Sequence, residues 1–152
     1  MRRRQAGFSY LIAMFLVAVL SVLSLRGLQI TLTKERREKE AQLLEVGEAY
    51  REAIRNYYEN SPGTFKRYPS SLDALLLDER TSTLRRHLRK LYRDPMTGSR
   101  EWGLVPAADG GIMGVFSLST RQPIKVGGFP DYMVAANKAK KYSDWQFSYS
   151  TR

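Results

Sequence analysis

The sequence has no cysteine and a single histidine among its 152 residues. The absence of cysteine excludes a disulfide framework and a thiolate metal site. The sequence also has no Ser/His/Asp spacing typical of nucleophilic catalysis, no glycine-rich phosphate loop and no pair of carboxylates on a predicted apolar face. We therefore predict that the protein is not an enzyme.

Acidic residues are also missing from the N-terminal end, where none precedes Glu35. The formal net charge is +10, and the arginines at positions 2, 3 and 4 supply three of these charges. A second basic excess lies between Asn60 and Arg100, with nine basic and four acidic residues. Such a balance is typical of proteins that contact an anionic membrane surface or a nucleic acid.

Charge is absent from the 18 residues between Phe8 and Leu25. A helix of about 20 residues crosses a bilayer core, and an extension past Arg26 reaches this length because an arginine side chain can snorkel to the headgroups. A secretory signal peptide fits less well, since no small-residue cleavage site and turn follow the run. We predict a transmembrane helix over Phe8–Leu32, with the basic N-terminus in the cytoplasm.

The helix is predicted to continue in water over residues 33–60. Apolar residues recur there every three or four positions, which predicts one buried face: Leu43, Val46, Tyr50, Ala53 and Tyr57. Four charged residues lie off this stripe and are expected to be solvated: Glu48, Arg51, Glu52 and Arg55. Pro62 disfavours helix at Ser61, so the helix should end near residue 60.

Residues 61–100 are predicted to form a helical and loop connection. Ser70 or Ser71 can cap a short helix over Leu72–Leu77. A following helix is indicated because three leucines fall on one face: Leu84, Leu88 and Leu91. The turn residues of Asp94–Gly98 close this part of the chain.

Residues 101–152 show the pattern of short strands. Runs rich in Val, Ile, Phe, Trp and Tyr are separated by glycine-rich turns, and they predict strands at Glu101–Val105, Ile112–Ser119 and Trp145–Tyr149. One face of a small antiparallel sheet can then cover the helical stripe while the other face is solvated. The expected fold class is α+β, with a long N-terminal helix packed on a small C-terminal antiparallel sheet.

The residues from Arg4 to Ile12, RQAGFSYLI, resemble the processing signal of type IV pilins and type II secretion pseudopilins. In that family a short basic leader ends in glycine, and a prepilin peptidase cuts before a phenylalanine. The resemblance implies a leader over residues 1–7, a cut between Gly7 and Phe8, and N-methylation of Phe8. Two further segments, Tyr68–Leu72 and Leu91–Gly98, are similar to the connection between helix and sheet in major pseudopilins.

This resemblance implies a structural subunit of a filament rather than a catalyst. The expected protein lies in the bacterial inner membrane as a single-pass chain, with a periplasmic C-terminal domain, and assembles into a homo- or hetero-oligomeric filament that drives protein export. Its implied partners are prepilin peptidase, other pseudopilins or pilins and an assembly platform protein. The expected assembly helix includes Phe8, Ile12, Ala13, Ala18 and Gly27, the last three being small residues that allow close helix packing.

One position departs from the family pattern. Pilin-like proteins usually have a glutamate at the fifth position of the mature chain, where it neutralises the amino terminus of a neighbouring subunit, and this sequence has Ile12. A buried ammonium group without a partner costs several kcal/mol unless another subunit supplies the acid. The departure indicates a specialised or minor subunit, for example at a filament tip.

Two alternatives remain open at the level of sequence. A DNA-uptake or adhesive type IV pilin would use the basic residues Arg85, Arg86, His87, Arg89, Lys90 and Arg93, although a solvated face or subunit contact is favoured over nucleic acid. The other alternative is an uncleaved single-pass anchored interaction protein. No metal or other cofactor is assigned; Asp131 and Asp144 would be the carboxylates of a calcium site in the C-terminal loops, and turn-forming roles are favoured for them.

Overall fold

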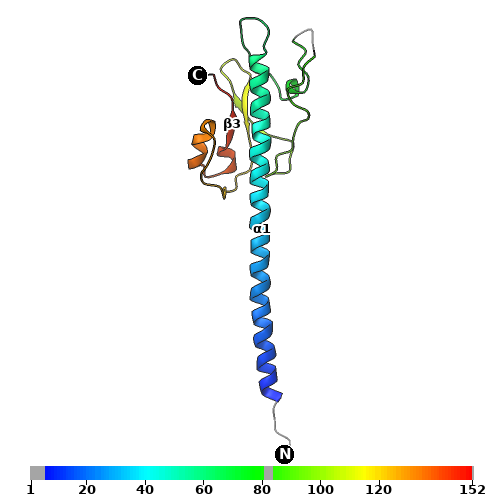
Figure 1. Cartoon of the computed structure of the whole chain (residues 1–152), viewed down its shortest axis with the longest axis vertical. Helices are drawn as coiled ribbons and strands as arrows, with labels where there is room; N and C mark the ends of the chain where they lie inside the picture. The colour runs from blue at the N-terminus through cyan, green and yellow to red at the C-terminus, as the bar shows by residue number, and fades with distance from the viewer. Residues whose placement is uncertain (1–5, 81–83, 152) are drawn as a thin grey trace, which may run out of the picture. The chain divides into compact units, whose positions relative to one another are not determined.

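The computed structural model describes residues 6–80 and 84–151, and at positions 6–9 and 22–30 it describes the backbone alone. The predicted α+β class is confirmed, because one long helix accompanies a three-stranded antiparallel sheet (Figure 1). The chain divides into two compact units, Met1–Arg37 and Glu38–Arg152.

Helix α1 spans Ala6–Glu59, a length of 54 residues, and contributes to both units. Within the described residues, no helix has a stretch that is both long enough and apolar enough to cross a membrane. The predicted span Phe8–Leu32 falls partly on positions 8, 9 and 22–30, whose side chains lie outside the described residues. Residues 1–5 of the predicted leader also lie outside them.

The second unit contains the sheet. Strands β1 (Gly103–Pro106), β2 (Ile112–Phe116) and β3 (Gln146–Ser148) lie in the order β1-β2-β3, and both pairs are antiparallel. The strands confirm the three predicted runs but are shorter than those runs. The glycine-rich β1–β2 turn forms as expected: the amide of Ala107 donates to Gly111 O at 2.8 Å, and Gly110 has a φ of 82°.

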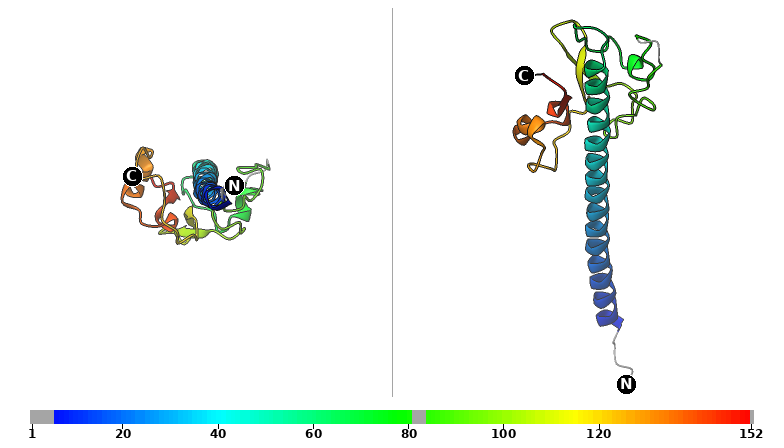
Figure 2. Two further views of the ribbon diagram at one scale, coloured as in Figure 1. Left: turned by 90° about the horizontal axis from the view of Figure 1, so that it is seen from below. Right: turned by 45° about the horizontal axis from the view of Figure 1, so that its top comes forward.

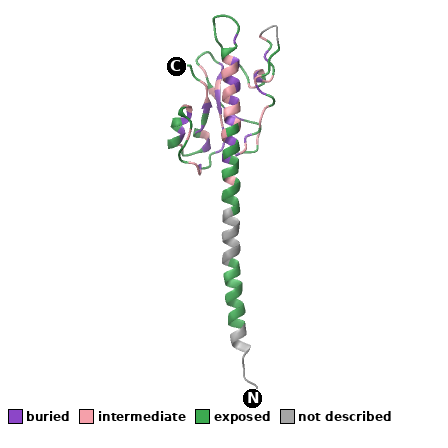
Figure 3. Cartoon of the chain, viewed as in Figure 1, coloured by how far each residue is buried: buried purple, intermediate pink, exposed green. Residues whose placement is uncertain are grey.

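The core of the second unit lies between the sheet and the C-terminal half of α1 (Figures 2 and 3). The predicted stripe is confirmed, because Leu43, Tyr50, Ala53 and Tyr57 are all buried and Val46 is half-buried. On the sheet side, Val115 and Phe147 are fully buried as well. The 3.6-residue period of the helix and the two-residue period of the strands therefore place their apolar faces together.

Three short 3₁₀ helices complete the described elements: η1 (Asp73–Leu75), η2 (Asp131–Lys138) and η3 (Tyr142–Asp144). The N-cap residue of η1 is Leu72, without a side-chain cap, although the predicted Ser71 lies beside it and its Oγ accepts a hydrogen bond from the amide of Ala74 at 3.4 Å. The regular structure there is limited to η1, so the helix predicted over Leu72–Leu77 is too long.

The helix predicted over Leu84–Leu91 is wrong, because this segment is irregular. Arg85 instead forms an antiparallel bridge with Asp78, and the amides of His87 and Leu88 both donate to Leu75 O, at 3.0 and 2.9 Å. Backbone groups that would have bonded within a helix are thus satisfied by η1 and the segment after it. The basic residues of this segment consequently share no helix face.

Candidate functional site

The predicted cleavage site lies at the start of α1, since the helix begins at Ala6 and so includes Gly7 and Phe8 in its first turn. Two predicted members of the assembly helix, Phe8 and Gly27, lie at positions where only the backbone is described. Because α1 includes Gly7 and Phe8, the backbone at the predicted cut is helical.

The described part of the N-terminal half of α1 exposes its apolar side chains. All residues from Tyr10 to Ser21, named here the apolar segment, are exposed, including the predicted assembly residues Ile12, Ala13 and Ala18 (Figure 3). Phe15 is 69% exposed and Ile12 is 46% exposed. The hydroxyl of Ser21 donates to Val17 O at 2.8 Å, so this polar group is satisfied within the helix.

A buried carboxylate fixes α1 to the C-terminal loops of the second unit. Glu40 is 4% exposed, and its Oε1 accepts hydrogen bonds from the amides of Ile124 and Lys125 at 2.6 and 3.2 Å. The hydroxyl of Tyr142 donates to the same oxygen at 2.8 Å. A carboxylate with several donors is a strong positional constraint, because charge-assisted hydrogen bonds are stronger than neutral ones.

The prediction of a solvated side chain is wrong for Arg51, which is only 17% exposed, whereas the side chain of Glu48 is 43% exposed. Arg51 donates to Ser148 O at 3.2 Å and forms an ion pair with Glu48 at 3.1 Å. Its guanidinium lies 3.9 Å from the ring centre of Tyr132, whose hydroxyl donates to Glu48. Burial and this hydrogen bond raise the pKa of Tyr132 above its ordinary value. The two charged residues thus connect α1 to η2 and β3.

The single histidine, His87, belongs to a largely buried polar cluster with Asp78 and Arg80. His87 Nε2 lies 3.0 Å from Asp78 Oδ2, and Arg80 donates to both carboxylate oxygens at 2.8 and 2.7 Å. The guanidinium of Arg80 also stacks on Tyr57, 3.4 Å from the ring centre, and donates to Ser61 Oγ at 2.8 Å. Through Arg80, the cluster fastens Asp78 and His87 to the C-terminal end of α1.

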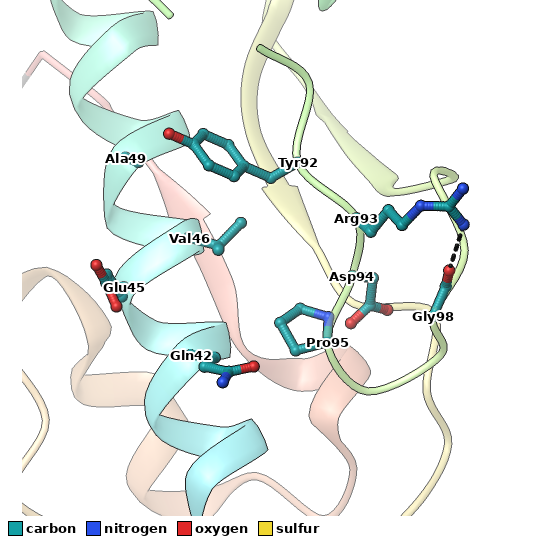
Figure 4. A pocket seen from close by; sticks show the side chains of 9 residues that line it. All are labelled: Gln42, Glu45, Val46, Ala49, Tyr92, Arg93, Asp94, Pro95 and Gly98. Atoms are coloured by element: carbon teal, nitrogen blue, oxygen red, sulfur yellow. Dashed lines mark hydrogen bonds between the residues drawn. The ribbon is translucent and has the colours of Figure 1, made fainter. Parts of the chain in front are cut away.

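A groove of about 450 Å³ lies within the second unit, between α1 and the loop after residue 91. In Figure 4, Val46 and Ala49 on the helix face Tyr92 and Pro95 on the loop, and the lining is mainly apolar. The other residues that line the groove are Gln42, Glu45, Arg93, Asp94 and Gly98.

The loop wall of this groove is held by a turn that the sequence predicted. Asp94 is fully buried, and its carboxylate accepts hydrogen bonds from the amide of Met96 and from two hydroxyl groups, those of Thr97 and Ser117, at 2.8, 2.9 and 2.7 Å. The amide of Gly98 donates to Asp94 O at 2.7 Å, with Gly98 at a φ of 75°. The groove therefore has preformed walls on both sides.

Tyr50 links α1 to the loop at Tyr92, the two segments that form the walls of the groove. Its hydroxyl accepts from the amide of Tyr92 at 2.9 Å and donates to Tyr92 O at 3.3 Å. Burial raises the pKa of Tyr50 to about 12. The ring centre of Tyr50 lies 5.2 Å from that of Trp102, so the same side chain also packs against the residue that precedes β1.

Asp144 is one of the two carboxylates considered for a calcium site. The carboxylate of Asp144 accepts from the amides of Lys140 and Lys141 at 2.8 and 2.9 Å, which is the turn-forming role favoured above. Over residues 6–80 and 84–151, no group of three or more acidic or histidine side chains is arranged to hold a metal ion.

The basic residues considered for DNA contact lie in the irregular segment after η1. Arg85 donates to Asn60 Oδ1 at 2.8 Å, and Arg93 donates to Gly98 O at 3.1 Å, so both contribute to local structure. Arg86 and Arg89 are exposed.

Comparisons of the chain with protein-family models, with curated proteins and with solved structures give no match.

Proposed function

We propose that the protein is a pseudopilin-like structural subunit of a type II secretion system or of a related type IV filament machine. In this function, residues 1–7 are removed and Phe8–Leu32 holds the mature chain in the inner membrane. The second unit lies in the periplasm, and subunits join through their N-terminal helices. The growing filament pushes exported protein toward the outer membrane. Prepilin peptidase, other pilin-like subunits and an assembly platform protein are the proposed partners.

The observation that carries this proposal is the exposure of the apolar segment. Tyr10, Phe15 and Val17 are 67%, 69% and 64% exposed, and they belong to a continuous apolar surface rather than to isolated positions. Large contiguous apolar surfaces are typical of membrane or protein contacts. Lipid or the equivalent helices of neighbouring subunits would cover this surface.

The second unit supports the same function. A helix with an exposed apolar segment toward its N-terminus, here residues 10–21, and a C-terminal half packed on a small sheet is the arrangement expected of a pilin-like subunit. Glu40, Glu48 and Tyr50 join the helix to loops and to η2 of the second unit, through partners that are distant in the sequence. These contacts suit a subunit whose domain must stay attached to its helix during assembly.

Ile12 supports a specialised or minor subunit within this class. Its side chain places a hydrocarbon group at the fifth position of the proposed mature chain, where pilin-like proteins usually have a carboxylate. The neutralising acid for the new amino terminus would then come from another subunit, because an unpaired ammonium in lipid is costly.

The proposal is tested by intact-mass and N-terminal analysis of the full chain expressed with and without prepilin peptidase. We expect a chain that begins at Phe8 only when the peptidase is present. Gly7→Leu is the control, and it should retain the leader because the bulky side chain blocks access to the scissile bond. A chain that still begins at Met1 with the peptidase present would contradict the proposal and favour an uncleaved anchored interaction protein.

A further inference from the structure

Phe65 is the most exposed of the large apolar residues that the structure describes, with 84% of its surface accessible. It lies in the loop over residues 61–67, directly after α1. Aromatic side chains are enriched among the residues that anchor protein interfaces. An isolated exposed phenylalanine is common on protein surfaces, so the inference depends on how this one is presented and on what it can meet.

The loop that presents Phe65 is fixed by hydrogen bonds on both sides of it. Ser61 Oγ accepts from the amide of Arg67 at 3.3 Å and from Arg80 at 2.8 Å. Lys66 Nζ donates to Glu59 O at 2.7 Å and to Ser61 O at 3.3 Å. A side chain on an ordered loop loses less conformational entropy on binding, so Phe65 is prepared for contact.

The groove defined by Val46, Ala49, Tyr92 and Pro95 offers a matching surface. It is mainly apolar, it has a volume of about 450 Å³, and its own chain does not use Phe65 to line it. The turn at Asp94 holds one wall and α1 forms the other (Figure 4). An aromatic ring from a second molecule could enter such a groove without rearranging its walls.

The charges beside the two surfaces are complementary. Phe65 is followed by two exposed cationic residues, Lys66 and Arg67, whereas the exposed Glu45 stands at the groove and the carboxylate of Asp94 lies beneath it. Arg93 is the one cation that lines the groove, and it donates to Gly98 O at 3.1 Å. Complementary charge favours this pairing and fixes its orientation.

We infer that Phe65 of one copy docks in this groove on a second copy of the chain. The two surfaces are different parts of the same unit, so the contact is head-to-tail and leaves a free Phe65 and a free groove at opposite ends of each pair. Contacts of this kind propagate into an open chain when the rotation between copies does not close a ring. The inference rests on the proposed filament function, because assembly brings the copies together.

The absence of native cysteine makes a cross-linking test direct. Two forms of the full chain, one with Gln42→Cys beside the groove and one with Thr64→Cys beside Phe65, are expressed together in cells that contain the assembly machinery. A short bismaleimide is then added to the membranes. We expect a cross-linked pair that contains one copy of each form. Replacing Thr64→Cys by Glu101→Cys, at another exposed position, should give no such pair.

Matched variants identify the residues on which the cross-link depends. Phe65→Ser should lower the cross-linked fraction about tenfold or more, as expected for loss of an aromatic anchor. Val126→Ser is the control, because Val126 is 78% exposed in another loop and should leave the fraction unchanged. Glu45→Lys in the groove copy should also lower the fraction, and Arg67→Glu in the other copy should restore part of it.

The outcomes separate this inference from the proposed function. Filaments that form without the cross-link would overturn the docking of Phe65 and leave the filament function standing. An equal loss for Phe65→Ser and Val126→Ser would also overturn it. A Phe65-dependent cross-link in a chain that keeps its leader and forms no filaments would support the docking contact and contradict the proposed function.

Discussion

Buried carboxylates set the positions of several loops in the second unit, and Asp78 shows how. Its side chain is almost fully buried, and Arg80 and His87 hydrogen-bond to it from the same segment of the chain. The hydrogen bonds from Arg80 contribute most to holding the pKa of Asp78 below its ordinary value. An ionised group in this environment depends on its partners, since an unpaired buried charge is strongly unfavourable.

Asp78→Asn should lower the free energy of unfolding by about 3 kcal/mol at pH 7, because Arg80 loses its buried partner. The depressed pKa means that the wild-type contribution is fully present above the unfolded-state pKa of about 3.9 and declines as the pH falls below it toward the folded-state pKa. The difference in the free energy of unfolding between wild type and Asp78→Asn should therefore shrink as the pH falls from 5 to 3. Urea unfolding followed by the fluorescence of the buried Trp102 and Trp145 measures it.

Asp131→Asn is the control for this experiment, because Asp131 is an exposed carboxylate at the start of η2. It should leave both the stability at pH 7 and its pH dependence nearly unchanged. A difference between Asp78→Asn and wild type that stays constant down to pH 3 would show that the ionisation of Asp78 is not its source.

At the scale of elements, the contact between α1 and β3 depends on one glycine. Gly47 is buried in the helix, and a Cβ at this position would overlap the ring of Phe147. Helix propensity alone favours alanine over glycine by about 1 kcal/mol. The close approach of ring and backbone opposes this preference, and the core cannot easily yield because Phe147 is itself fully buried.

Gly47→Ala should therefore destabilise the second unit by about 1–3 kcal/mol, the usual range for overpacking, instead of stabilising it. The same urea experiment measures the effect. Phe147→Leu, added to Gly47→Ala, should recover part of the loss because the smaller side chain makes room. Ala41→Gly, at an exposed position of α1, gives the propensity effect alone. A net gain of stability for Gly47→Ala would contradict the steric argument.

The elements also show where prediction from the sequence succeeds and where it fails. Local periodicity located the helical stripe and the three strands, and turn residues located Asp94–Gly98. The same periodicity misled at Leu84–Leu91, because leucines spaced like a helix face instead belong to a segment whose amides bond to Leu75 O. The hydrogen bonds from Ile124 to Glu40 and from Tyr132 to Glu48 each join residues 84 positions apart, and no local pattern in one sequence indicates such pairs.

For the whole molecule, the division into two units separates the core from the apolar segment. The described buried hydrophobic residues all lie at or beyond Leu43, whereas residues 10–21 are exposed. The second unit thus has its own core, as an independently folding domain requires. Of the two candidate surfaces, the apolar segment could be predicted from the composition of the sequence. The groove could not, because it depends on tertiary contacts between α1 and the loop at Tyr92.

A chain that begins at Lys34 should fold with a thermal midpoint within about 3 °C of the full chain in the same detergent, because it retains every described core residue. It should also leave the membrane fraction, since the apolar segment is gone. Thermal unfolding followed by near-ultraviolet circular dichroism and cell fractionation test the two parts. Loss of cooperative unfolding would show that residues before Lys34 are needed for the fold of the second unit.

The position of Glu40 determines where a force applied to α1 first acts on the second unit. It is the first buried residue of α1 within the second unit, and the hydrogen bonds it accepts come from the amides of Ile124 and Lys125 and the hydroxyl of Tyr142. Tension applied to the N-terminal end of α1 therefore reaches these bonds before it reaches the stripe or the sheet. Since one carboxylate oxygen receives all three, the load is shared in parallel, and the C-terminal loops act as the attachment point through which the helix would pull the domain.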